Sequence, residues 1–347
     1  MIKGYIEGYY GAILSWKDRK TIINLLPKLN LNSYLYCPKE DPKHRIHWKL
    51  DYSVDELNNF KEISELANIN KVNFIFGISP GNEEHIDFDK LANKIGIFRE
   101  IGFKNFCILF DDLIEPGNPI QQANTLNNCQ ERFQDCTFYL VPEIYANSLS
   151  NSDIFENKYL NDLFSNINDK PNIFWTGKKV ISNKYDYEEI KKLEDFYNLN
   201  IYIWDNFYAS DYCEPRVTLD KYLPFIRNIP PEISGIMINA TGKINLDLLI
   251  LQLYSLGFQG DDFEISDFLS SELHPSFRLI SKYFTFNGSI INPDDYEDVN
   301  DILHNWIHPI KNEIYPYLHL LKFLMQNIES IDSNFIRRIR LKERGDK

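Results

Sequence analysis

The chain has 347 residues, of which 44% are hydrophobic and 25% charged, so it can bury a large core without disulfide bonds. Its net charge of -13 argues against binding to nucleic acid or to an anionic membrane, because both depend on clustered Lys and Arg. The five cysteines lack CxxC spacing, and the first apolar run begins directly after Met1. These features predict a cytoplasmic protein with reduced cysteines and without a signal peptide.

Eight short apolar runs, rich in Ile, Val, Phe, Tyr and Trp, follow one another along the first part of the chain. They are Lys3 to Glu7, Ser33 to Cys37, Asn73 to Gly77, Asn105 to Phe110, Thr137 to Val141, Asn172 to Thr176, Asn200 to Asp205 and Gly235 to Asn239. Near-continuous apolar runs are typical of parallel strands that are covered on both faces.

The segments between these runs have helical periodicity. Residues 53 to 56 form a capping box before a stripe that includes Phe60 and Ile63. A second stripe includes Leu91 and Phe98, and Gly102 follows it where a C-terminal cap is expected. Eight strand and helix units in roughly 250 residues predict an α/β fold of the (β/α)8 TIM-barrel type. No GxGxxG follows the first strand, which removes the usual support for a dinucleotide-binding fold.

The pattern changes after Gly257, where no further strand-like run occurs. The remaining segments have helical patterns: 265 to 273, 275 to 283, 301 to 306 and 310 to 339. We therefore predict a catalytic barrel over residues 1 to 260 and a C-terminal helical segment over 261 to 347. This segment is too small and too apolar to stand alone, so we expect it to pack on the barrel.

Polar residues end almost every run, and barrel enzymes place their active sites at these carboxyl ends. The fourth run stops at Asp111 and Asp112, which gain nothing from packing because ionised carboxylates resist unpaired burial. Successive side chains of a regular strand point to opposite faces, so both can serve one cavity only where the strand ends or bulges. Asp111 and Asp112 are therefore the candidate catalytic residues.

At this point the chain resembles glycoside hydrolase family 84, the retaining β-N-acetylglucosaminidases that include protein O-GlcNAcases and bacterial hyaluronidase-like enzymes. The resemblance extends over the whole barrel and rests on four segments in the same order: residues 4 to 11 (GYIEGYYG), 34 to 45 (YLYCPKEDPKHR), 109 to 112 (LFDD) and 204 to 206 (WDN). It implies the TIM-barrel fold and hydrolysis of terminal β-linked GlcNAc.

The resemblance also implies roles for individual residues. Asp111 orients and polarises the substrate 2-acetamido group, and Asp112 is the general acid and then the base. The remaining residues contact the sugar: Gly8 (through its backbone) and Lys39 hold a hydroxyl, Asp211 and Asn239 hold the far side of the ring, Tyr145 and Asn206 line the acetamido pocket, and Trp204 forms a wall.

Three segments depart from the family pattern. Residues 142 to 145 read Pro-Glu-Ile-Tyr where the family often has Pro-Thr-Glu-Tyr, and residues 175 to 179 read Trp-Thr-Gly-Lys-Lys where it has Trp-Thr-Gly-Pro-Lys. Residues 238 to 240 read Ile-Asn-Ala where it has Thr-Asn-Pro. The first and last departures concern the surroundings of Tyr145 and the loop after Asn239, and neither includes the aspartates.

The chemistry of two adjacent carboxylates agrees with this family. Neighbours on one chain do not easily flank opposite faces of a sugar, so attack by the acetamido oxygen through an oxazoline fits better than a two-carboxylate retaining mechanism. One Asp must stay charged while the other carries a proton, and repulsion between close carboxylates separates their titrations in that direction.

Several candidates also have a structural interpretation. Asp111 and Asp112 could cap a helix, Lys39 could belong to a surface charge cluster, and Trp204 could belong to the core. Gly8 could relieve strain in a turn. His304 and His308 have the spacing of a metal pair, but no Glu of an HExxH motif lies between them, so we expect a structural role.

The sequence therefore predicts a retaining β-N-acetylglucosaminidase that acts on GlcNAc-bearing glycoproteins or glycans without metal or organic cofactor. Two alternatives stay open: a non-hydrolytic GlcNAc-binding protein on the same barrel, and a metal-dependent barrel hydrolase. A homodimer through the C-terminal helices is also open. The natural aglycone, whether a protein, a glycan or a cell-wall fragment, is not specified by the sequence.

Overall fold

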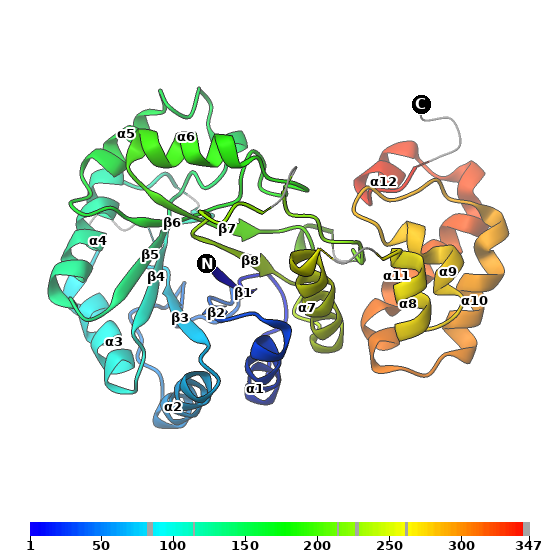
Figure 1. The fold of residues 1–347 in the computed structure, drawn as a ribbon, viewed down its shortest axis with the longest axis horizontal. Helices are drawn as coiled ribbons and strands as arrows, with labels where there is room; N and C mark the ends of the chain where they lie inside the picture. Colours follow the sequence, from blue (N-terminus) through cyan, green and yellow to red (C-terminus); the bar gives the residue numbers. More distant parts are fainter. Residues whose placement is uncertain (82–85, 114, 214, 226–228, 261–262, 343–347) are drawn as a thin grey trace. The chain divides into compact units, whose positions relative to one another are not determined.

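The computed structural model describes residues 1–81, 86–113, 115–213, 215–225, 229–260 and 263–342. Eight parallel strands form a closed barrel in chain order, and helices surround the strands (Figure 1). The strands are β1 (Ile2–Glu7), β2 (Ser33–Tyr36), β3 (Asn73–Ile78), β4 (Asn105–Leu109), β5 (Thr137–Val141), β6 (Asn172–Trp175), β7 (Asn200–Asp205) and β8 (Gly235–Asn239). The predicted fold class is confirmed, and each strand lies within one residue of its predicted ends.

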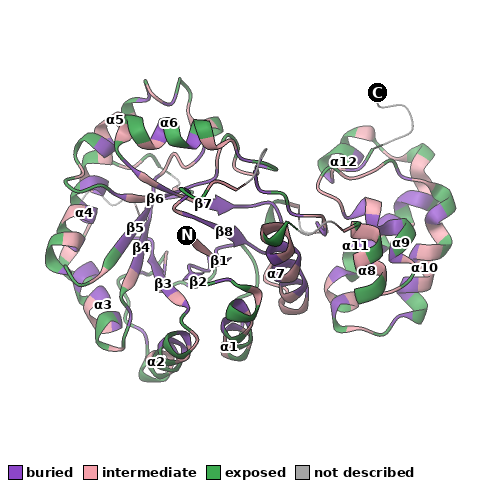
Figure 2. Ribbon diagram, in the orientation of Figure 1, coloured by how far each residue is buried: buried purple, intermediate pink, exposed green. Residues whose placement is uncertain are grey.

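Helices α1 to α6 follow strands β1 to β6 in turn, and the connections also contain short 3-10 turns at Leu26–Leu29 and Asn147–Leu149. Their bounds are α1 (Trp16–Leu25), α2 (Val54–Ile69), α3 (Phe88–Glu100), α4 (Pro119–Arg132), α5 (Lys158–Ser165) and α6 (Tyr187–Tyr197). The capping box predicted before α2 is present, since Ser53 Oγ accepts the Glu56 N–H at 3.3 Å and Glu56 Oε2 accepts the Ser53 N–H at 2.6 Å. Figure 2 shows buried residues along the strands and exposed residues on the outer sides of these helices.

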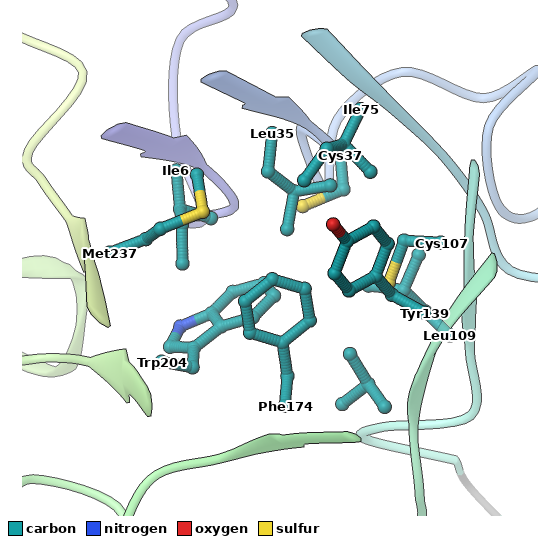
Figure 3. Packing of buried hydrophobic residues seen from close by; sticks show 11 residues of the cluster. Ile6, Leu35, Cys37, Ile75, Cys107, Leu109, Tyr139, Phe174, Trp204 and Met237 are labelled. Atoms are coloured by element: carbon teal, nitrogen blue, oxygen red, sulfur yellow. The ribbon is translucent and has the colours of Figure 1, made fainter. Parts of the chain in front are cut away.

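The inside of the barrel is filled by side chains that alternate along the strands. Ile6, Leu35, Cys37, Ile75, Cys107, Leu109, Tyr139, Val141, Phe174, Trp204 and Met237 form one buried cluster (Figure 3). Large apolar side chains from every strand thus close the barrel below its carboxyl-terminal rim, as expected for this fold. A packed interior leaves the strand ends and the loops after them as the place for chemistry.

The chain divides by its contacts into two units, of which the first contains residues 1 to 206 and 224 to 242. The second contains residues 207 to 223 and 243 to 347 and includes α7 (Ile244–Gln259). The predicted domain boundary at residue 260 stays a prediction. The packing of residues 261 to 347 on the barrel likewise stays a prediction.

Beyond α7 the second unit contains α8 (Ile265–Glu272), α9 (Phe277–Ile280), α10 (Tyr296–Asn305), α11 (Pro309–Asn327) and α12 (Ser333–Arg338). The single helix predicted over residues 310 to 339 is wrong, because α11 ends at Asn327. Asp332 then caps a new helix by accepting the Asn334 N–H at 2.7 Å. The helix predicted from residue 301 begins earlier, at Tyr296. No helix in the described part of the chain is long and apolar enough to cross a membrane.

Segment 207 to 223 is tied to the C-terminal helices by a buried arginine within the second unit. Arg216 is 1% exposed and donates hydrogen bonds to the backbone oxygens of Val217, Tyr283 and Thr285 and to the Tyr317 hydroxyl. The Leu219 N–H also donates to the Phe284 oxygen at 2.7 Å. Through Arg216 this segment therefore depends for its buried hydrogen bonds on residues that come 67 to 101 positions later.

Candidate active site

Asp111 and Asp112 follow the end of β4, where the chain leaves the sheet and turns. Asp112 has φ of 53°, in the left-handed region that Asp tolerates better than most residues. The turn breaks the alternation of the strand, so that both carboxylates lie within reach of the same lysine. Lys39, from the loop after β2, forms an ion pair with Asp111 Oδ2, and its Nζ lies 3.6 Å from Asp112 Oδ2.

Asp111 is 6% exposed, and its two oxygens have different surroundings. Oδ2 accepts a hydrogen bond from Lys39, whereas the buried Oδ1 has no hydrogen-bond partner. A buried polar atom without a partner is rare, because it has lost water without gaining a replacement. Asp111 therefore presents one satisfied oxygen and one acceptor that is free for a donor.

Asp112 is more open, with its side chain 33% exposed, and both of its oxygens are occupied. The Tyr145 hydroxyl donates to Oδ1 at 2.8 Å, and the Tyr10 hydroxyl donates to Oδ2 at 3.0 Å. Arg45 donates to the Asp112 backbone oxygen at 2.9 Å and to the Tyr10 hydroxyl at 3.1 Å. We call Tyr10, Lys39, Arg45, Asp111, Asp112 and Tyr145 the charged cluster.

Donors around Asp112 stabilise its charged form. Partial burial raises the pKa of Asp112, but Lys39 and the two tyrosine hydroxyls lower it by more, so the net shift is downward. Burial likewise lowers the pKa of Lys39, and the two aspartates raise it by more. The downward shift of the Asp112 pKa is opposite to the direction that repulsion between the two carboxylates would give, because Lys39 lies next to both of them and offsets that repulsion.

A second group of predicted residues lies at the ends of β7, β8 and β1. Asn206 Oδ1 accepts hydrogen bonds from the Trp204 indole at 3.0 Å and from Asn239 Nδ2 at 3.0 Å, and Asn239 Oδ1 accepts the Gly8 N–H at 3.2 Å. We call Gly8, Trp204, Asn206 and Asn239 the amide cluster. Its side chains are at most 8% exposed, and Trp204 also belongs to the barrel core.

Gly8 is required by close contact rather than by a left-handed backbone. A Cβ at this position would lie 2.5 Å from Cζ2 and 2.7 Å from Cη2 of Trp204. The indole is held by Asn206 and by the core, so it has little room to move. Any larger residue at position 8 would therefore displace the Trp204 ring or the loop after β1.

Asp211, the remaining predicted site residue, lies in the second unit at the start of a 3-10 helix, Asp211–Cys213. The other eight predicted residues all belong to the barrel unit, and the structure groups them in the charged and amide clusters. Roles for all nine stay predictions. His308 caps α11 by accepting the Ile310 N–H at 3.2 Å, and the described residues contain no group of His, Cys, Asp and Glu suited to a metal ion.

Tyr10 and Arg45 were not assigned roles from the sequence, although both lie in segments that carry the resemblance. No sequence pattern marks either residue as part of a site, since tyrosine and arginine are common at loop surfaces. Glu7, the polar residue at the end of β1, belongs to neither cluster. It is fully buried and accepts two hydrogen bonds from Arg19 of α1 and one from the Tyr34 hydroxyl. It supports the attachment of α1 to the barrel.

The departures from the family pattern leave the charged cluster intact. Glu143 Oε2 accepts the Gly117 N–H at 2.8 Å, and the Glu143 N–H donates to the Tyr159 hydroxyl at 2.8 Å. The Thr176 N–H donates to the Tyr145 oxygen at 2.8 Å, so the backbone of Tyr145 is held by the neighbouring strand end. Ala240, after Asn239, is fully buried.

Comparison with known proteins gives one family over most of the chain. Residues 3–254 match the family model described as beta-N-acetylglucosaminidase. Protein O-GlcNAcase of Mus musculus is 28% identical over 251 residues, which are 68% of this chain and 27% of that protein, and the figures for Protein O-GlcNAcase of Rattus norvegicus are the same. The chain thus spans little more than a quarter of these relatives. The solved structure of CpGH84B superposes with a TM-score of 0.79 at 23% identity, covering 97% of this chain and 71% of that one.

Proposed function

Because the chain belongs to the β-N-acetylglucosaminidase family, we propose that it hydrolyses terminal β-linked GlcNAc with retention of configuration, through an oxazoline formed by the substrate's own acetamido group. The observation that carries this mechanism is the unequal environment of the two aspartates. Asp111 has a buried acceptor oxygen without a partner beside an ion pair with Lys39, whereas Asp112 is open and contacted by hydroxyl groups.

In the first step Asp111 Oδ1 accepts the acetamido N–H, which makes the acetamido oxygen a better nucleophile. That oxygen attacks the anomeric carbon, the bond to the leaving oxygen breaks, and Asp112 gives its proton to the leaving oxygen. Lys39 forms an ion pair with Asp111, and its ammonium group offsets the cost of burying that carboxylate.

In the second step Asp112, now a carboxylate, takes a proton from water while the water oxygen attacks the anomeric carbon. The oxazoline opens, the acetamido group is restored, and the product keeps the β configuration. The donors around Asp112 lower its pKa, whereas a general acid has to carry its proton at the start of the reaction, so we propose that substrate binding displaces some of these donors.

For substrate we propose a GlcNAc residue on a protein side chain, on the ground that the mouse and rat relatives are named protein O-GlcNAcases. We propose a cytoplasmic location, which is supported by the five cysteines, none of which forms a disulfide in the structure. Asp211 and Asn239 are proposed to hold the far side of the sugar, Tyr145 and Asn206 to line the acetamido pocket, Gly8 and Lys39 to hold a hydroxyl, and Trp204 to form a wall.

The test compares release of 4-nitrophenol from its β-GlcNAc and β-glucose derivatives. Only the first has an acetamido group, so we expect cleavage of the β-GlcNAc compound and no cleavage of the glucoside. Comparable turnover of both would contradict the mechanism. Proton NMR of the first-formed sugar should show the β anomer, and full activity after dialysis against EDTA would separate this enzyme from a metal-dependent hydrolase.

A further inference from the structure

Arg45 belongs to the charged cluster but does not lie at a strand end. It comes from the loop between β2 and α2, six residues after Lys39. Its guanidinium group donates to the Asp112 backbone oxygen at 2.9 Å and to the Tyr10 hydroxyl at 3.1 Å, and the same hydroxyl donates to Asp112 Oδ2 at 3.0 Å. Arg45, Tyr10 and Asp112 thus form a closed ring of hydrogen bonds around the proposed acid.

The residues just before Arg45 are hydrogen-bonded to the end of β3 and to α3. His44 is 1% exposed, its Nδ1 lies 2.9 Å from the Gly77 oxygen, and its backbone oxygen accepts the Ser79 N–H at 2.9 Å. Lys94 of α3 donates to the Lys43 oxygen at 2.9 Å. Arg45 therefore reaches Asp112 from a fixed backbone, which is a condition for holding another group in place.

Asp112 needs such support because its backbone is in the left-handed region, with φ of 53°. Non-glycine residues adopt this conformation at a cost, and its persistence in a structure indicates that neighbouring contacts impose it. Among the interactions described for Asp112, that of Arg45 acts on the backbone oxygen, whereas those of Tyr10 and Tyr145 act on the carboxylate.

We propose that Arg45 is a positioning residue for the general acid, holding Asp112 in its left-handed conformation so that its carboxyl group aims at the leaving-group oxygen. The inference rests on the proposed function of Asp112. Arginine suits this task because its planar guanidinium has two donors in a fixed fork, one for the Asp112 backbone and one for Tyr10. A lysine at this position has one flexible ammonium group and does not hold both acceptors in the same geometry.

The experiment compares Arg45→Met and Arg45→Lys with wild type on aryl β-GlcNAc substrates whose phenols differ in pKa. A misaimed acid should matter most when the leaving group needs a proton. We therefore expect kcat for the poorest leaving group to fall about 100-fold in Arg45→Met, with little change in KM and a smaller loss for 4-nitrophenol. The slope of log kcat against leaving-group pKa should steepen accordingly.

Arg45→Lys separates charge from geometry. It keeps the positive charge, so the pH profile of kcat/KM should stay close to that of wild type. In Arg45→Met the loss of charge favours the protonated form of Asp112 and should move the basic limb to higher pH. The leaving-group slope of Arg45→Lys should nevertheless remain steeper than in wild type, because one flexible ammonium group does not restore both hydrogen bonds in the geometry of the guanidinium fork.

Arg99→Met is the matched control, since Arg99 forms an exposed ion pair with Asp135 outside the site and should behave as wild type. An unchanged slope in both Arg45 variants, while Asp112→Ala steepens it, would overturn the inference and leave the proposed function standing. Absence of β-GlcNAc cleavage by the wild type would instead overturn the proposed function. If Arg45→Met does not fold, the slope of Arg45→Lys decides the matter.

Discussion

The charged cluster and the amide cluster occupy the same rim of the barrel but are built in opposite ways. In the charged cluster a lysine, an arginine and two tyrosine hydroxyls converge on two carboxylates, one of which keeps an unpartnered oxygen. In the amide cluster neutral groups satisfy one another in a chain from Trp204 to Gly8. The charged cluster keeps an acceptor oxygen available for a substrate donor, and the amide cluster fixes the shape of the barrel rim.

The contrast predicts that changes in the charged cluster alter rate with little loss of stability, and that changes in the amide cluster alter both. Charged groups at a site are positioned for the transition state, and their removal often relieves repulsion or desolvation. Neutral buried networks instead contribute to folding, because each broken bond leaves a partner unsatisfied.

The largest expected effect is on the aspartates. Asp112→Ala should lose about 10² to 10⁴-fold in kcat/KM for a poor leaving group and much less for an activated phenol, which departs without a proton. Asp111→Ala should slow every substrate to a similar degree, because oxazoline formation is common to all of them. The measurement is the dependence of kcat/KM on leaving-group pKa, with folding checked by circular dichroism. Exchanged slopes would mean exchanged roles, and equal slopes would mean that neither Asp is the dedicated acid.

Gly8→Ala should break the amide cluster through its shape. The added methyl group would meet the Trp204 indole at 2.5 Å, and overpacking of this kind costs about 1 to 3 kcal/mol of unfolding free energy. Urea unfolding followed by tryptophan fluorescence measures the loss. Gly96→Ala in α3 is the control, since nothing lies within 4 Å of its added Cβ and the change should stabilise the helix. Equal stability of the two variants would show that position 8 has room to adapt.

Asn239→Ala and Asp211→Ala test the proposed contacts with the far side of the sugar. Each should lower kcat/KM by the equivalent of roughly 1 to 3 kcal/mol through lost hydrogen bonds to hydroxyl groups. Asn239→Ala should also lower the unfolding free energy, because Asn239 links Asn206 to Gly8. A variant with wild-type kcat/KM would remove its residue from the site.

The smallest effect concerns pH. Tyr10→Phe removes one of the donors that lower the pKa of Asp112, so that pKa should rise. If activity requires a protonated Asp112, the basic limb of kcat/KM marks the loss of that proton, and it should move to higher pH in Tyr10→Phe. The pH profiles of kcat/KM for Tyr10→Phe and for Tyr145→Phe should both show the basic limb at higher pH than in wild type. A shift to lower pH would contradict the assignment of the basic limb to Asp112.

The sequence predicted the architecture well because the barrel strands are short, apolar and regularly spaced. Runs such as Thr137 to Val141 and Gly235 to Asn239 agree with the strands residue by residue, and the fold class, the family and the class of glycoside hydrolase are confirmed. The capping box at Ser53 was equally predictable, since it depends only on two residues that are three positions apart. Local chemistry was sufficient wherever the element is defined by its neighbours in the chain.

Contacts between residues that are far apart in the sequence could not be predicted in this way. The ring formed by Arg45, Tyr10 and Asp112 joins residues 35 to 102 positions apart, and nothing local distinguishes Arg45 from a surface arginine. The effect of Lys39 on the titration of Asp112 was missed for the same reason. In the C-terminal half, an apolar pattern that continues past Asn327 hid the helix end, because periodicity does not reveal where a cap such as Asp332 interrupts it.

The discontinuous second unit has a consequence for how the protein is made. Segment 207 to 223 leaves the ribosome before β8, yet Arg216 and Leu219 find their acceptors only after residues 283 to 317 have been synthesised. Phe207, which is 5% exposed in the finished structure, likewise stacks on Phe286, which is synthesised 79 residues later. Nascent chains with exposed aromatic surface are prone to aggregation, and domains fold as units during synthesis. The second unit therefore completes late, after the barrel strands have all been synthesised.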